Sequence, residues 1–131
     1  MKITGKVQKV DDDRKIIFGW ASIANDANGQ AVVDSDNDTI PIGELEQAAY
    51  RYVEFSRKGG EMHIPERTGV ANLIESMIFT PEKSELLGIG GLPQGWWVGF
   101  RVTDDAVWQK VKSGEYSMFS IGGRAVRSEV I

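Results

Sequence analysis

The chain has 131 residues and a net charge of −4, and 41% of its residues are hydrophobic while 26% are charged. These values are typical of a folded protein, and the length suits one hydrophobic core, so we expect a single domain over residues 1–131. Charges of both signs are mixed along the chain, which argues against a nucleic-acid groove, and no apolar run approaches the ~20 residues of a membrane span.

The first third of the chain is predicted to form β-structure. "KITGKVQKV" (2–10) and "KIIFGWASIA" (15–24) have strand patterns, and "DDDR" (11–14) between them supplies turn residues, which predicts a β-hairpin. "NDANGQ" (25–30) is a second turn, and "AVVDSDNDTI" (31–40) indicates a short strand and an acidic loop. The N-terminal stretch lacks the apolar block of a secretory signal, so we expect a soluble, cytoplasmic protein.

The clearest predicted helix is "IGELEQAAYRYVEFSRKGG" (42–60), whose apolar residues recur at three- and four-residue steps and whose two final glycines end it. Further elements alternate after it: a strand (70–79), a short helix (80–88), an aromatic strand (96–102), a capped helix (103–114) and a long strand (116–131). These predict an α+β fold, with about six or seven strands in one antiparallel, barrel-like sheet flanked by two or three helices.

The acidic stretch "DSDND" (34–38) spaces its aspartates as a calcium-binding loop does, so we compared it with that motif. Such a loop needs glycine at its sixth position and glutamate at its twelfth, where this chain has Thr39 and Leu45. We therefore favour an acidic turn. With one histidine and no cysteine, we expect neither a metal nor a cofactor.

The adjacent tryptophans Trp96 and Trp97 alternate in a predicted strand. One ring should face the core and the other should face outward. An exposed tryptophan would suit a dimer or substrate surface, but core packing is the favoured interpretation.

Catalytic groups are restricted because cysteine is absent and His63, in "GGEMHIPERTG" (59–69), is the single histidine. The catalytic groups that remain possible are carboxylates, lysine, or a serine activated by His63. Ser120 lies in the apolar strand segment "MFSIGGRA", just before two glycines that let backbone N–H groups approach a reacting carbonyl. It has the setting of an acyl-transfer nucleophile, although a strand serine followed by glycines is more often part of a β-bulge. Ser76 and Ser117 are lesser candidates.

Several segments together resemble the XkdF-type phage serine protease family: "GWASIANDANGQAVVDSDNDTIPIGELEQAAYRYV", "GEMH", "IESMIFTPEK" and "LPQGWWVGFRVTDDAVWQKVKSGEYSMFSIGGRA". The resemblance runs from about Gly19 to Arg127. That family is similar to the prohead (capsid maturation) proteases, which are similar in fold to the herpesvirus assembly protease, assemblin.

The resemblance implies an antiparallel β-barrel flanked by helices, and endopeptidase cleavage of phage capsid and scaffold proteins inside the assembling procapsid in the bacterial cytoplasm. It places the family's histidine on His63 and its nucleophile on Ser120. By serine-hydrolase logic, His63 accepts the Ser120 proton, and backbone N–H groups around Gly122, Gly123 or Arg124 hold the oxyanion. No cofactor is implied. A homodimer or higher oligomer, and a chain truncated at its C-terminus, stay open.

The resemblance does not identify a third catalytic residue in this chain. Related proteases have a histidine or an acid on a strand beyond the nucleophile, and no second histidine follows Ser120. Glu75 is the preferred substitute because its strand directly follows the His63 loop. Glu61 and Glu129 are alternatives, and a Ser–His pair alone is another. The rival function is a non-enzymatic head-morphogenesis or scaffold protein of the same fold, and a carbohydrate-binding or structural β-module is a weaker third.

Overall fold

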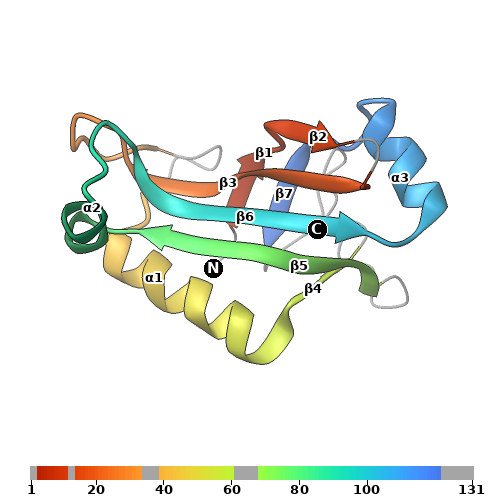
Figure 1. Ribbon diagram of the computed structural model, residues 1–131, viewed down its shortest axis with the longest axis horizontal. Helices are drawn as coiled ribbons and strands as arrows, with labels where there is room; N and C mark the ends of the chain where they lie inside the picture. Colours follow the sequence, from red (N-terminus) through yellow and green to blue (C-terminus); the bar gives the residue numbers. More distant parts are fainter. Residues whose placement is uncertain (1–2, 12–13, 34–38, 61–67, 122–131) are drawn as a thin grey trace.

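A computed structural model describes residues 3–11, 14–33, 39–60 and 68–121 (Figure 1). In chain order its elements are β1 (Ile3–Lys6), β2 (Lys9–Asp11), β3 (Ile16–Asn25), α1 (Ile42–Arg51), the π-helical turn η1 (Tyr52–Ser56), β4 (Lys58–Gly60), β5 (Thr68–Phe79), α2 (Pro81–Leu87), β6 (Gln94–Val102), α3 (Asp105–Lys112) and β7 (Met118–Ile121). The α+β class is therefore as predicted.

The strands are divided between two antiparallel sheets. Five of them follow the order β2-β3-β6-β5-β4, and β1 pairs with β7 in a separate two-stranded sheet. The predicted single barrel-like sheet of six or seven strands is not confirmed, because β2 and β4 end the larger sheet without pairing to each other. The division arises where the chain changes partner: Val7 N–H donates to Ser117 O (2.9 Å), but Gln8 N–H donates to Phe18 O (3.0 Å).

The helix predicted over residues 42–60 is shorter in the structure. The α-helical part ends at Arg51, and η1 then closes with a bond from Arg57 N–H to Tyr52 O (2.9 Å). Arg57, with φ 61°, takes the left-handed position that the glycines were expected to fill. Lys58–Gly60 instead forms β4, which pairs with β5.

The two other helices begin at the caps that the sequence indicates. Thr80 Oγ1 accepts a hydrogen bond from Lys83 N–H (3.2 Å), with Pro81 as the first residue of α2. Asp104 Oδ1 accepts one from Val107 N–H (2.9 Å) at the start of α3. Beyond β7, the rest of the strand predicted over residues 116–131 lies outside the described residues.

The core lies between α1 and one face of the larger sheet. Alternate residues of β6 are fully buried on this face: Trp96, Val98, Phe100 and Val102. The ring of Tyr52 packs edge-on against Trp96, with ring centroids 5.6 Å apart. Leu45 and Ala49 of α1 and Val107, Trp108 and Val111 of α3 belong to the same cluster.

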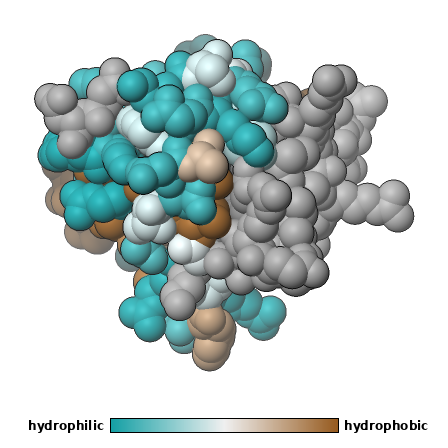
Figure 2. Space-filling model, turned by 90° about the vertical axis from the view of Figure 1, so that its right-hand side faces the viewer, coloured by the Kyte–Doolittle hydropathy of each residue, from teal (hydrophilic) through white to brown (hydrophobic). Residues whose placement is uncertain are grey.

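The opposite face of the sheet carries half-buried aromatic side chains. Trp97 packs edge-on against Trp20 (ring centroids 5.4 Å apart) and also contacts Phe18, and Trp20 contacts Phe79. Trp96 in the core and Trp97 on the other face confirm the predicted alternation. From the α3 end of the molecule, the visible surface of the described residues is mostly hydrophilic (Figure 2).

Candidate active site

Ser120, the predicted nucleophile, lies in β7. Its Cα pairs with that of Thr4 in β1, and Phe119 pairs with Gly5. The sequence was therefore right to place Ser120 in a strand. The proposed oxyanion residues Gly122, Gly123 and Arg124 lie outside the described residues.

Gly5 determines how closely β1, and β7 with it, approaches the larger sheet. A Cβ atom at Gly5 would lie 1.9 Å from the carbonyl oxygen of Trp20 and 2.6 Å from that of Ala21 in β3. Real Cβ atoms do not come so near to backbone, so a glycine is required where β1 crosses β3. Because β7 pairs with β1, the strand that holds Ser120 is separated from the bulged part of β3 by β1.

His63 belongs to residues 61–67, which lie outside the described residues. The chain leaves the described part at Gly60 and returns at Thr68, and these two residues are paired in the β4–β5 ladder. The position of His63 relative to Ser120 therefore stays a prediction.

The strand that carries Ser120 and the strands that flank residues 61–67 belong to different sheets. Ser120 lies in the two-stranded β1–β7 sheet, whereas β4 and β5, on either side of residues 61–67, are neighbours in the five-stranded sheet, where β4 is an edge strand.

Glu75 is exposed and lies at the β5 bulge, opposite Gly99. Its carboxylate lies over that glycine, where a Cβ atom would be 2.9 Å from Glu75 Oε1. Along β5, Glu75 is ~23 Å from Thr68 at ~3.3 Å per residue, so a contact with His63 would need residues 61–67 to fold back along the strand. Its role as third member stays a prediction, and the alternatives Glu61 and Glu129 lie outside the described residues.

The two lesser serine candidates have other roles in the structure. Ser76 Oγ accepts a hydrogen bond from the indole Nε1–H of the fully buried Trp96 (2.9 Å). Ser117 is exposed, and its carbonyl oxygen accepts the bond from Val7 N–H.

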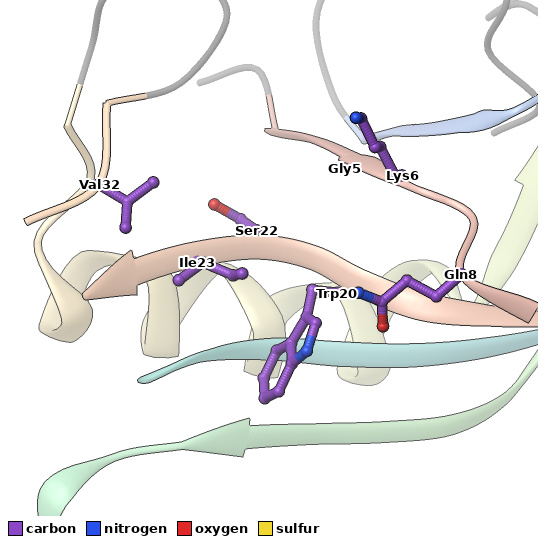
Figure 3. A pocket seen from close by; sticks show the side chains of 7 residues that line it. All are labelled: Gly5, Lys6, Gln8, Trp20, Ser22, Ile23 and Val32. Carbon is purple, nitrogen blue, oxygen red and sulfur yellow. The ribbon is translucent and has the colours of Figure 1, made fainter. Parts of the chain in front are cut away.

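A pocket at the outer edge of β3, which sequence reasoning missed, lies on the other side of β1 from β7. We call it the β3-edge pocket. It has a volume of about 230 Å³ (Figure 3) and is lined by Gly5, Lys6, Gln8, Trp20, Ser22, Ile23 and Val32. The one signal that pointed to it is a polar residue, Ser22, within the apolar stretch "FGWASIA".

Within the described residues, no three His, Asp or Glu side chains are placed to hold a metal ion. The acidic stretch 34–38 lies outside those residues. Burial raises the pKa of the Tyr52 phenol, although a hydrogen bond from Ser56 opposes that shift, so this hydroxyl stays neutral. No helix in the described part of the chain is long and apolar enough to cross a membrane.

Comparison with known proteins identifies the class of this chain. It belongs to the family described as "Putative phage serine protease XkdF", whose model matches residues 4–129. It is 27% identical over 117 residues to a Bacillus subtilis (strain 168) protein named "Uncharacterized protein YqbD". The alignment covers 89% of this chain and 34% of that protein, so the chain spans about a third of its relative's length. No solved structure matches it.

Proposed function

We propose that this chain is a phage prohead serine endopeptidase that cleaves capsid and scaffold proteins within the assembling procapsid, in the cytoplasm of the bacterial host. The observation that carries the proposal is the family match over residues 4–129, which includes both His63 and Ser120. Ser120 lies in a strand at the edge of the described region, and His63 is the chain's single imidazole.

The proposed reaction follows serine-hydrolase chemistry. Ser120 Oγ attacks a peptide carbonyl carbon while neutral His63 accepts the hydroxyl proton. Backbone N–H groups around Gly122, Gly123 or Arg124 hold the oxyanion, and His63 then protonates the leaving amine. His63 then accepts a proton from water as the water oxygen attacks the acyl carbon, and it gives that proton to Ser120 Oγ as the acyl–oxygen bond breaks. Glu75 is kept as the candidate that orients His63.

Mutation of the two proposed catalytic residues tests this function. The chain is co-expressed with the capsid and scaffold proteins of its phage, and cleavage is followed by electrophoresis and mass spectrometry. Ser120→Ala and His63→Ala should each reduce cleavage at least about a thousandfold, because either change removes the activated nucleophile. Ser117→Ala is the matched control, since that exposed serine lies three residues earlier and should leave cleavage unchanged.

Unchanged processing by either Ser120→Ala or His63→Ala would refute the assignment. The rival function, a scaffold protein that retains the fold without the chemistry, predicts a different result. The wild-type chain would then co-purify with capsid or scaffold protein without cutting it, and both variants would do the same.

A further inference from the structure

We propose that the outer edge of β5 binds an extended peptide in which an aliphatic residue is followed directly by lysine or arginine. We call residues 74–78, on the side of β5 that faces away from β6, the β5 edge. It belongs to a different sheet from Ser120, so the inference goes beyond the proposed function and does not depend on it.

Within the described residues, only the first half of β5 is paired on its outer side. β4 pairs with β5 no further than Asn72, and Leu73 N–H then donates to Arg57 O (2.9 Å). Beyond Leu73 no described strand pairs with this side of β5, which continues past the end of β4 (Figure 1). Residues 74–76 are all exposed, so solvent reaches the β5 edge there.

The backbone groups of the β5 edge point outward in a regular order. The pairing of β5 with β6 has no register shift from Glu75 to Phe79, and the one shift in β5 lies before Glu75. Ile78 O points outward, because it accepts a hydrogen bond from Lys83 Nζ (3.1 Å) in α2. Alternate residues of an antiparallel strand point their N–H and C=O groups to the same side. Ser76 therefore directs both groups outward, and Ile78 directs its N–H outward as well.

The open stretch is long enough to pair with a short strand. From Leu73 to Ile78 the chain extends ~17 Å at ~3.3 Å per residue. In antiparallel pairing, a peptide residue opposite Ser76 exchanges two hydrogen bonds with it, and the residue two positions earlier accepts one from Ile78 N–H. Lys83 ends the stretch because its Nζ already occupies Ile78 O. The β5 edge thus offers backbone groups of the kind that hold an added strand.

A pocket adjoins the β5 edge on the side that faces α1. It has a volume of about 320 Å³ and is lined by Ala49 and Tyr50 of α1, Val53 and Glu54 of η1, Ser76, Met77 and Ile78 of β5, and Lys83 of α2. Such a volume lies at the lower end of the ~300–1,000 Å³ of ligand sites. It therefore suits one side chain and the backbone that carries it better than a larger free ligand.

This pocket lies where an added strand would direct a side chain. The side chain of Ser76 is on the core face of β5, since its Oγ accepts a hydrogen bond from buried Trp96. A peptide residue paired with Ser76 points its side chain to the same face and so into the pocket. Ala49, Val53 and Ile78 line it with apolar atoms there. The residue opposite Ser76 is therefore aliphatic.

Glu75 favours a basic residue beside the aliphatic one. Its exposed side chain lies on the opposite face of β5, over Gly99, and it forms no salt bridge within the described part of the chain. In an antiparallel peptide, the residue that follows the aliphatic one lies opposite Glu75, and opposite charges in facing positions of two strands attract. The reverse order would place the basic residue opposite Met77.

Binding can be measured by an NMR titration of the Ser120→Ala chain, so that no cleavage by the proposed nucleophile intervenes. The probe is acetyl-Thr-Thr-Val-Lys-Thr-amide. It should shift the backbone amide signals of Ser76 and Ile78 in a saturable way and slow their hydrogen exchange, because both N–H groups gain acceptors. The amide of Met77, which points toward β6, should shift less.

Two control peptides test the direction and the backbone pairing. Acetyl-Thr-Lys-Val-Thr-Thr-amide has the same composition with the lysine before the valine, and it should bind about two- to fivefold more weakly, the size of one cross-strand charge pair. The probe methylated on the valine nitrogen lacks the N–H that bonds to Ser76 O. It should bind at least about tenfold more weakly, because that acceptor loses its partner.

Matched variants test the location. Val53→Trp fills the pocket and should weaken binding of the probe at least about tenfold. Val33→Trp places the same ring on a residue that is 57% exposed and does not line the pocket, and it should leave binding nearly unchanged. Glu75→Gln should remove the difference between the probe and its lysine-first control, whereas Glu115→Gln, at another exposed site, should preserve it. Melting temperatures confirm that each variant folds.

Three results would overturn the inference: unchanged Ser76 and Ile78 amides, equally tight binding of the N-methylated probe, or a folded Val53→Trp variant that binds as the parent does. If both amides instead become protected as the concentration of the chain alone rises, a second copy occupies the β5 edge and the peptide proposal falls. None of these measurements depends on whether Ser120→Ala abolishes processing, so the two proposals fail independently.

Discussion

The hydrogen bond between Trp96 and Ser76 explains a polar side chain on the core face of β5. The Trp96 ring is completely buried, and its indole Nε1–H has Ser76 Oγ as acceptor at 2.9 Å. A serine that the sequence offers as a minor nucleophile candidate thus has a structural use. Its oxygen satisfies a donor that water does not reach in the folded chain.

Removing that oxygen should destabilise the fold. We expect Ser76→Ala to lower the free energy of unfolding by about 1–3 kcal/mol, because it leaves the indole N–H of Trp96 unsatisfied. Urea denaturation measures the change. In a Trp96→Phe background the same substitution should cost under about 0.5 kcal/mol, since no donor remains. Equal losses in both backgrounds would show that the hydrogen bond contributes nothing.

At the scale of elements, β1 approaches β3 at Gly5 more closely than the backbone approaches at any other described glycine. Gly5→Ala would place a Cβ atom 1.9 Å from Trp20 O, which is backbone and cannot rotate away. We expect the substitution to lower the free energy of unfolding by about 1–3 kcal/mol by forcing the strands apart. Cleavage should fall with it, since β7 and Ser120 move with β1.

Gly43 provides the matched control for this prediction. It lies in α1, and a Cβ atom there would meet nothing within 4 Å. Gly43→Ala should therefore raise the free energy of unfolding by up to about 1 kcal/mol through helix propensity. A destabilisation as large as that of Gly5→Ala, measured in the same denaturation experiment, would contradict the close-approach argument.

Element prediction from sequence succeeded where a local side chain determines a boundary. Thr80 and Asp104 cap α2 and α3 as their residue types indicate. It failed at the end of α1, where the glycine pair 59–60 is the usual C-cap signal but Arg57 adopts the left-handed conformation. That conformation costs a non-glycine residue roughly 1–2 kcal/mol. It is selected by the pairing of β4 with β5, which no local pattern contains.

At the scale of the whole molecule, Lys15 and Asp105 join the turn before β3 to the start of α3. Lys15 Nζ donates a hydrogen bond to Asp105 Oδ1. This bond and the lysine's charge hold the pKa of the Asp105 carboxyl below its ordinary value. A lowered folded-state pKa stabilises the fold above the ordinary carboxyl range, and the benefit is lost as pH falls through the folded value.

Asp105→Asn should therefore lower the melting temperature slightly at pH 7, and its effect should shrink as the pH falls below the ordinary range of an aspartate carboxyl. The effect should be small because Asp105 is fully exposed, and 1 M salt should reduce it further. Melting curves across pH, with and without salt, measure it. A difference that grows toward acid pH would have the wrong sign and would exclude the interaction.

The arrangement of the sheets was the part of the fold that the sequence could not supply. Residues 2–10 carry one strand pattern, yet the chain changes partner between Val7 and Gln8, from Ser117 to Phe18. Strand patterning reports which face is buried but not which strand lies beside it. For the candidate site, residue types singled out Ser120 and His63, whereas the β3-edge pocket is lined by residues from three separate stretches of the chain, which residue types alone do not bring together.

The pairing of β1 with β7 also has a consequence for the order of folding. Ile3 pairs with Ile121, so this ladder joins residues from the two extremes of the described chain. Contacts of such high sequence separation carry the largest loop-closure entropy, and they form late unless the intervening chain is already compact. We therefore expect the strand that carries the proposed nucleophile to dock after the α1–β5–β6 core has assembled. If Ser120 is the nucleophile, activity should emerge only when this last docking step is complete.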